Sequence, residues 1–145
     1  MGFSSFVFWI FLLHLQAGWV EYRGSEVGQR GDVMDIWVHF TIGQGYHIQS
    51  SDPEDDQLIP TRVDVDLPEG WELLDVEFPE TESFRLEGTQ QVLQVYSKEL
   101  TVQVSVRVPE DFSGLETFEG ILHYQACDHA KCYFPRALEF SVDLW

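Results

Sequence analysis

The chain is poor in positive charge. Of its 145 residues, 8 are Lys or Arg and 25 are Asp or Glu, which gives a formal net charge of -17. A surface this acidic repels phosphate backbones and anionic lipid headgroups, so the composition argues against nucleic acid as a partner. The charge agrees with a well-solvated surface and with protein partners that dock through basic or neutral faces.

Long apolar runs are also scarce. The run at 6–13 has the length of a signal-peptide core, and Leu15-Gln16-Ala17 places a small residue at a plausible cleavage point. No Lys or Arg precedes this run, and His14 ends it, so it falls short of the roughly 20 apolar residues that span a membrane. We predict a cleaved signal peptide at 1–17 and a periplasmic or otherwise exported protein. An uncleaved anchor and a wrongly assigned start are the alternatives.

Sustained helical periodicity is absent, and alternation of apolar and polar residues takes its place. Alternation puts the apolar side chains on one face of a half-buried strand. Turn residues such as Gly43-Gln44-Gly45 and Pro68-Glu69-Gly70 separate the alternating segments. The segments are 36–42, 63–67, 101–108 and 138–144, and 71–78, 91–97 and 118–126 are further strand candidates. With 44% apolar residues to fill a core, the pattern predicts one all-β domain, an immunoglobulin-like antiparallel β-sandwich at 33–145 after a lead-in at 18–32.

Cysteine is nearly absent, and the two cysteines present stand close together. They are Cys127 and Cys132, within the segment YQACDHAKCYFP at 124–135. The antibody-type sandwich disulfide joins cysteines far apart in sequence on facing sheets, so this pair is of another kind. It is also not a Cys-x-x-Cys motif in a βαβ setting, which excludes a thioredoxin fold.

Three uses of the pair have different requirements. A structural bridge closing so short a loop contributes roughly 2 kcal/mol on the chain-entropy estimate. A metal site would recruit His129 and His123 beside the two sulfurs, but structural zinc prefers two well-spaced ligand pairs, which disfavours a metal site here. Thiol-disulfide exchange needs an accessible sulfur, a thiolate and a resolving partner, and a close pair supplies the partner.

The charged neighbours of the pair do not decide between a structural bridge and exchange. His129, Lys131 and Arg136 supply positive charge that would favour a thiolate, whereas Asp128 opposes it. Because the direction of these side chains is not given by spacing, both uses stay open on the residues alone.

Ordered landmarks along the chain add a resemblance. They are Gly45-Tyr46-His47-Ile48, Leu67-Pro68-Glu69-Gly70-Trp71, Phe78-Pro79, Val95-Tyr96, and the cysteine segment with Tyr124-Gln125-Ala126-Cys127 and Cys132-Tyr133-Phe134-Pro135. Together they resemble the N-terminal periplasmic domain of the thiol:disulfide interchange protein DsbD, whose hairpin pattern is Tyr-Gln-Ala/Gly-Cys and then Cys-Tyr-x-Pro. The match covers about 33–144.

The resemblance implies an immunoglobulin-like carrier of reducing equivalents that needs no cofactor. Cys132 is expected to form the mixed disulfide and Cys127 to resolve it. The expected donor is a thioredoxin-like domain or a DsbD-type membrane reductase, and the expected substrates are oxidised exported proteins. Such a chain stands between an electron carrier and an enzyme of the thiol-disulfide oxidoreductase class.

The resemblance also implies a cap loop over the sulfurs, between Pro79 and Gln91. Phe84 is the expected shield and Leu86 its competitor, although Phe84 also fits an ordinary core anchor. Some relatives place tyrosines where this chain has His47 and Gln49. These two and His129 are therefore candidates for tuning the sulfurs, and for His47 the plainer alternative is a local hydrogen bond.

The chain also departs from the family. Four residues separate the cysteines, fewer than in the best-known relative, and full-length members continue into a membrane domain and a thioredoxin-like domain, whereas this sequence stops at Trp145. We therefore expect separate donor proteins or a new use of the domain. The competing hypothesis is a non-catalytic binding module that keeps the bridge as a structural disulfide.

Overall fold

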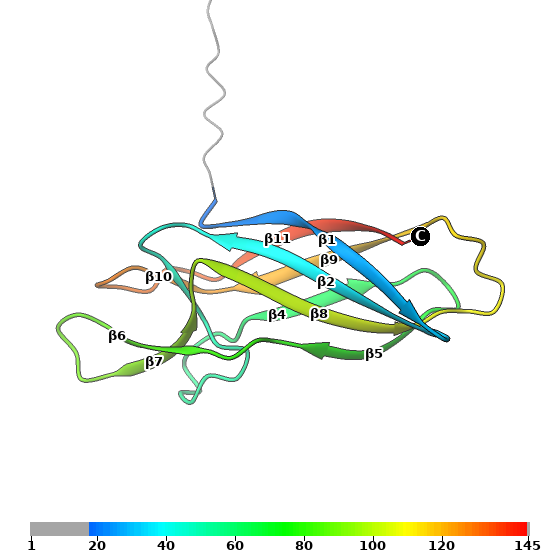
Figure 1. Ribbon diagram of the computed structural model, residues 1–145. Helices are drawn as coiled ribbons and strands as arrows, with labels where there is room; N and C mark the ends of the chain where they lie inside the picture. Colours follow the sequence, from blue (N-terminus) through cyan, green and yellow to red (C-terminus); the bar gives the residue numbers. More distant parts are fainter. Residues whose placement is uncertain (1–17, 145) are drawn as a thin grey trace, which may run out of the picture.

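The computed structural model describes residues 18–144, and within them every regular element is a β-strand (Figure 1). Consequently, none of the described residues belongs to a helix with the length and apolar character needed to cross a membrane. The strands are β1 (Val20–Arg30), β2 (Val33–Ile42), β3 (His47–Gln49), β4 (Arg62–Asp66), β5 (Glu72–Glu77), β6 (Glu82–Arg85), β7 (Val92–Tyr96), β8 (Glu99–Arg107), β9 (Glu116–Tyr124), β10 (Ala126–Cys127) and β11 (Arg136–Leu144).

The strands form two layers with an extension at one end. One layer is the sheet β1-β2-β8-β5, and the other is the sheet β11-β9-β4 (Figure 1). A third, small sheet of four short strands, with the order β10-β3-β7-β6, lies at the end of the molecule drawn on the left. Every strand pair is antiparallel. The predicted all-β, immunoglobulin-like antiparallel sandwich is confirmed.

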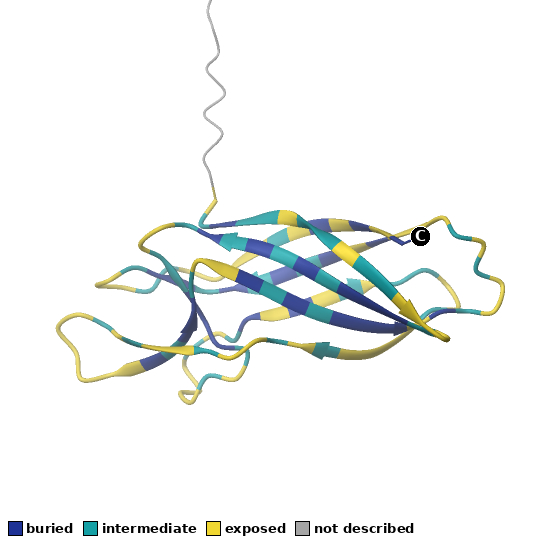
Figure 2. Ribbon diagram, in the orientation of Figure 1, coloured by how far each residue is buried: buried dark blue, intermediate teal, exposed yellow. Residues whose placement is uncertain are grey.

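The alternation along each strand produces the core between the layers. In β8, Val102, Val104 and Val106 are fully buried, and their partners in β2 include the fully buried Val38, Ile36 and Met34. Buried positions alternate with intermediate or exposed ones along several strands of the two layers (Figure 2). β8 pairs with both β2 and β5, so it is a central strand, and its apolar residues alternate with polar ones along its whole length.

The predicted lead-in at 18–32 contains a strand of the sandwich. β1 pairs with β2 from Val20 opposite Ile42 to Arg30 opposite Val33. The register shifts between Tyr22 and Gly24, where Gly24 has a φ of 111°, and this bulge interrupts the alternation that marks the other strands. The sheet therefore starts ahead of residue 33, and the predicted signal peptide at 1–17 lies outside the described residues.

A glycine lets an aromatic ring fill the centre of the core. Gly120 in β9 is the cross-strand partner of Phe140 in β11, and a Cβ at position 120 would lie 2.2 Å from Phe140 Cζ. The Phe140 ring makes an edge-to-face contact with Phe40 of the other layer, with centroids 5.4 Å apart. The bare backbone at Gly120 thus makes room for a contact that joins the two sheets.

Candidate functional site

The two cysteines form a disulfide at the end of the molecule that carries the small sheet. Cys127 ends β10, and Cys132 faces it across a tight loop, with an S–S distance of 2.04 Å. The loop is closed by backbone hydrogen bonds from Asp128 N to Lys131 O and from Tyr133 N to Ala126 O. Cys127 is fully buried, whereas Cys132 is partly exposed. The two sulfurs therefore differ in access to a partner.

Asp128 organises the loop between the cysteines. Its Oδ1 accepts hydrogen bonds from the backbone N–H groups of Ala130 and Lys131, both at 2.8 Å, and its Oδ2 accepts one from the Tyr133 hydroxyl. The Tyr133 bond first, and then the two backbone bonds, lower the pKa of Asp128 to about 2. The same bond raises the pKa of Tyr133 to about 12. An ionised Asp128 thus holds the turn in shape.

The basic residues of the segment contact aromatic rings and a carboxylate. Lys131 Nζ lies 5.0 Å from the centre of the Tyr133 ring, and the Arg136 guanidinium carbon lies 4.1 Å from the centre of the Trp19 ring. The exposed His129 has its Nε2 3.7 Å from Glu87 Oε2. The contacts of Arg136 and His129 join the hairpin to other segments, whereas that of Lys131 lies within it.

Cys127 belongs to a small apolar cluster of its own, apart from the sandwich core. It packs with Leu93 and Val95 of β7, and Leu58, Phe84 and Cys132 cover this cluster. We call these six residues the sulfur pocket. Leu58 and Leu93 were not predicted as site residues from the sequence. The alternation of Leu93 and Val95 in a strand candidate was the available signal, but it does not say which sulfur they would meet.

The segment predicted as a cap reaches the cysteine hairpin. Phe84 in β6 lies in the sulfur pocket and stacks on His47 with ring centroids 4.0 Å apart. The loop between β6 and β7 contacts the hairpin through the Glu87 N–H, which donates to the His129 carbonyl at 2.9 Å. Leu86 lies in a turn, where its carbonyl accepts a hydrogen bond from the Thr89 hydroxyl. Of the two cap candidates, Phe84 is the one that the structure brings to the sulfurs.

β3 brings the two tuning candidates to the same place. His47 lies opposite Cys127 in the pairing of β3 with β10. Gln49 is fully buried, and its Nε2 lies 3.2 Å from Cys127 Sγ and 3.8 Å from Cys132 Sγ. Within the described chain, His47 Nδ1 and Gln49 Oε1 are buried atoms without a hydrogen-bond partner. Both positions were candidates in the sequence analysis, but nothing in the sequence indicated that the Gln49 amide would point at the sulfurs.

No metal-ligand cluster accompanies the sulfurs in the part of the chain that the structure describes. Residues 18–144 contain no group of three or more His, Cys, Asp or Glu side chains arranged to hold a metal ion. His123, one of the ligands considered from sequence, has its Nε2 2.9 Å from Asp64 Oδ2. The two sulfurs are bonded to each other in this form.

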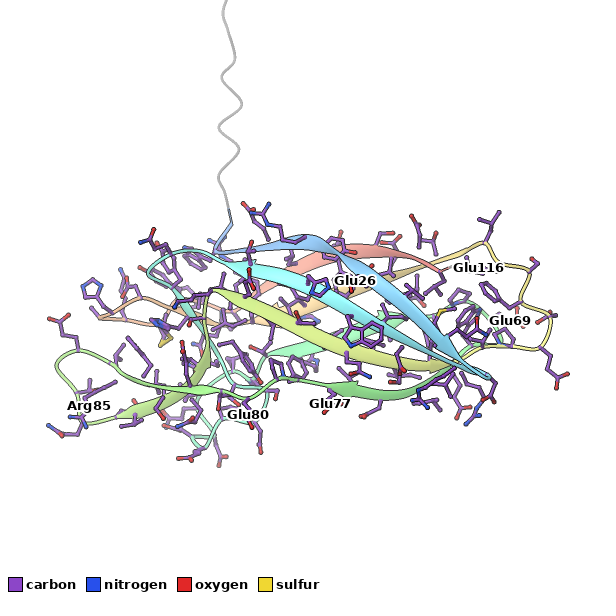
Figure 3. The ribbon with its side chains drawn as sticks, in the orientation of Figure 1. Glu26, Glu69, Glu77, Glu80, Arg85 and Glu116 are labelled. Carbon is purple, nitrogen blue, oxygen red and sulfur yellow. A yellow bond between two sulfur atoms is a disulfide. The ribbon has the colours of Figure 1, made fainter. Side chains whose placement is uncertain are left out.

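The hairpin carries an exposed aromatic side chain. Phe134, two positions after Cys132, is 91% exposed, and the yellow sulfur bond lies at the same end of the molecule as Arg85 (Figure 3). A partly exposed cysteine, close in sequence to an exposed aromatic residue and bonded to a fully buried cysteine, is suited to a two-step exchange of disulfides with another protein.

Comparison with known proteins points to one family. The family profile described as "Thiol:disulfide interchange protein DsbD, N-terminal" matches residues 21–144. The N-terminal periplasmic domain of ScsB from Proteus mirabilis is similar in structure, with a TM-score of 0.60 and 14% identity over 88% of this chain. This chain spans 46% of that ScsB chain. No curated protein sequence matches the chain.

Two further solved structures are similar at lower TM-scores. The reduced DsbD N-terminal domain of Neisseria meningitidis has a TM-score of 0.49 and 20% identity, covering 83% of this chain and 89% of that one. The complex of the DsbD and PilB N-terminal domains from Neisseria meningitidis has a TM-score of 0.46 and 19% identity, covering 81% of this chain and 80% of that one.

Proposed function

The chain belongs to the family of DsbD N-terminal domains, and from that premise we propose that it carries reducing equivalents from a thioredoxin-like or membrane donor to oxidised exported proteins. The observation that carries the proposal is the difference between its two bonded sulfurs. Cys127 is fully buried within the sulfur pocket, and Cys132 is partly exposed on the hairpin. A structural bridge has no need for this difference, whereas directed exchange depends on it.

In the proposed reaction the two cysteines act in sequence. With both cysteines reduced, the Cys132 thiolate attacks one sulfur of a substrate disulfide, and the other substrate sulfur leaves as a thiolate that takes up a proton. The Cys127 thiolate then attacks Cys132 Sγ, which reforms the bond within the hairpin and releases the second substrate thiolate. The substrate gains two electrons and this chain loses two. A donor dithiol restores the chain by the reverse sequence.

The proposed donor and location rest on the family. The resemblance to this family implies a thioredoxin-like donor, so we propose such a domain, or a DsbD-type membrane reductase, as the source of electrons. The ScsB domain of similar fold is periplasmic, which supports a periplasmic or otherwise exported location for this chain. Phe134 offers an apolar contact beside Cys132 for either partner.

The reduction potential of the Cys127–Cys132 pair tests the proposal. Equilibration against glutathione, with oxidised and reduced protein separated after acid quenching, should give a value of roughly -180 to -270 mV, where redox-active carriers lie. A Cys132→Ala variant cannot form the disulfide, so it shows which change in the separated species comes from the cysteine pair. A potential below about -300 mV would mark a structural disulfide, and the binding-module hypothesis would then replace this one.

A further inference from the structure

Gln49 makes an unusual contact for a buried amide. In the described part of the chain, it is the buried polar side chain that lies within hydrogen-bond distance of a sulfur, with its Nε2 3.2 Å from Cys127 Sγ. Disulfide sulfurs carry no hydrogen and can only accept, so the amide must present its N–H group to them. The contact therefore assigns Gln49 as the donor.

The backbone around Gln49 is firmly held. Its N–H donates to the Gln125 carbonyl at 3.2 Å, its carbonyl accepts from the Thr61 hydroxyl, and β3 pairs it with Val95 of β7. A side chain on such a support is directed at Cys127 before any reaction begins. This is the arrangement that preorganised donors use to stabilise developing charge.

The other end of the amide argues against a purely structural role. Gln49 Oε1 is buried and has no hydrogen-bond partner among the described residues. A buried acceptor without a partner costs free energy, and an apolar residue of similar size would avoid that cost. The contribution of an amide at this position must then come from its hydrogen bond to the sulfur.

Cys127 is the sulfur that needs a donor. It is fully buried among Leu93 and Val95, and burial away from water penalises a thiolate that lacks a hydrogen bond. Whenever the Cys127–Cys132 bond opens toward a partner, the electron pair of that bond leaves on Cys127. Whenever the bond closes, Cys127 attacks as a thiolate. Cys127 Sγ therefore carries the negative charge both when the disulfide opens and when it closes.

We propose that the Gln49 side-chain amide is a catalytic hydrogen-bond donor that stabilises the Cys127 thiolate as the disulfide opens and closes. The proposal rests on the exchange function proposed above and assigns one of its steps. In the closing step, the Cys127 sulfur bonds to Cys132 Sγ, the bond from Cys132 to the partner sulfur breaks, and the partner sulfur leaves as a thiolate that is protonated by water. Gln49 donates throughout and is unchanged.

The closing step can be isolated with a chromogenic aromatic disulfide, dithionitrobenzoate. Reduced protein first forms a mixed disulfide at Cys132 and releases one thionitrobenzoate. Attack by Cys127 then releases a second, in a first-order phase independent of reagent concentration. The rate of this second phase, followed by stopped-flow absorbance over acidic to alkaline pH, reports the Cys127 thiolate directly.

Gln49→Leu should slow the second phase by about tenfold to a hundredfold at neutral pH, because a hydrogen bond to a charged group is lost. Its pH–rate curve should also move to higher pH. Gln94→Leu is the matched control, since Gln94 lies on β7 and its amide bonds to Ser83 and Thr81 instead of sulfur. The control should keep the native rate. If Gln49→Leu does not fold, Gln49→Met, which is longer and more flexible, replaces it.

The outcomes separate the two proposals. A folded Gln49→Leu or Gln49→Met variant with the native second-phase rate and pH profile would overturn the role of Gln49 and leave the exchange function standing. A native protein that releases no second thionitrobenzoate would overturn the exchange function, and the role of Gln49 with it.

Discussion

The sandwich core and the disulfide end differ in the kinds of side chain that they bury. In the core, the rings of Phe40 and Phe118 each make an edge-to-face contact with the Phe140 ring, and aliphatic side chains fill the rest of the space. At the disulfide end, a small apolar cluster shares its space with a buried amide and an imidazole.

Unsatisfied polar atoms mark the same division. Of the three buried side-chain atoms without a partner in the described residues, two, His47 Nδ1 and Gln49 Oε1, lie beside the disulfide. The third is His39 Nε2 on β2. Such atoms reduce stability, so the sandwich must supply the stability that the reactive end gives up. We therefore expect substitutions in the core to lower mainly stability, and substitutions at the disulfide end to change mainly the reactivity of the sulfurs.

The largest expected effect comes from a matched pair of phenylalanines. Phe118 is 1% exposed in the core, and Phe134 is 91% exposed beside Cys132. Phe118→Ala should lower the free energy of unfolding by about 3–5 kcal/mol, because it leaves a cavity. Phe134→Ala should change it by no more than about 0.5 kcal/mol and should slow exchange with protein partners only. Urea unfolding of both variants checks this, and equal losses would erase the proposed division.

Removal of the disulfide should have an intermediate effect on stability. The Cys127→Ala/Cys132→Ala double variant should lose roughly 2 kcal/mol, since the bond closes a short loop. The sandwich should keep its fold, as measured by circular dichroism and by urea unfolding. A double variant that is unfolded at room temperature would show that the bond is a structural staple and that the sandwich depends on the disulfide end.

The cap loop should control access to the disulfide, and weakening the cap should lower the stability of the fold only a little. Phe84→Ala removes the ring that stacks on His47 and packs against the buried part of the sulfur pocket, so reduction of the disulfide by dithiothreitol should become several-fold faster. Leu86→Ala is the control, because Leu86 lies in the turn of the same loop. The initial rates of reduction decide the point. Equal rates for Leu86→Ala and Phe84→Ala would assign the shielding to the loop as a whole.

The smallest effect concerns pH and the turn at Asp128. Its pKa of about 2 in the folded chain lies below its ordinary value of 3.8, so folding favours the ionised form. The contribution of this carboxylate to the hairpin is full above about pH 4 and is lost as the pH falls through about 2. NMR titration of the Ala130 and Lys131 amides should show this.

Tyr133→Phe sharpens the same test. It removes the largest cause of the shift, so the pKa of Asp128 should rise toward its ordinary value and the amide titration should move to higher pH. Ser141→Ala on β11 is a control hydroxyl away from the turn, because it bonds to Glu119. An unchanged titration in Tyr133→Phe would mean that the backbone bonds alone hold the carboxylate.

The sequence predicted those strands whose side chains alternate without a break. β2, β4, β8 and β11 were found in this way because one face of each meets the core. β1 was missed, since Gly24 and its bulge interrupt the alternation, and β3 is too short to show any period. Such strands are defined by pairing with their partners more than by their own pattern. They can therefore be located only in the tertiary structure.

The site was predicted as a set of positions but not as a geometry. The cysteine pair and the cap segment follow from a local motif and the order of landmarks. The contact of Gln49 with Cys127 joins residues 78 positions apart, so no local spacing encodes it. The bond from Tyr133 to Asp128 is local, and an Asp followed by a short turn was the signal available for it.

The disulfide and its surroundings also differ in when they can form during folding. The two cysteines are five positions apart, so an oxidant can close the bond before the rest of the chain has folded. With two cysteines in the whole chain, one molecule has no wrong internal pairing to undo. The difference between the two sulfurs arises later, when β3 and β7 pack against β10. Before that packing the two cysteines are alike in exposure, so only the folded chain can direct the proposed exchange to Cys132.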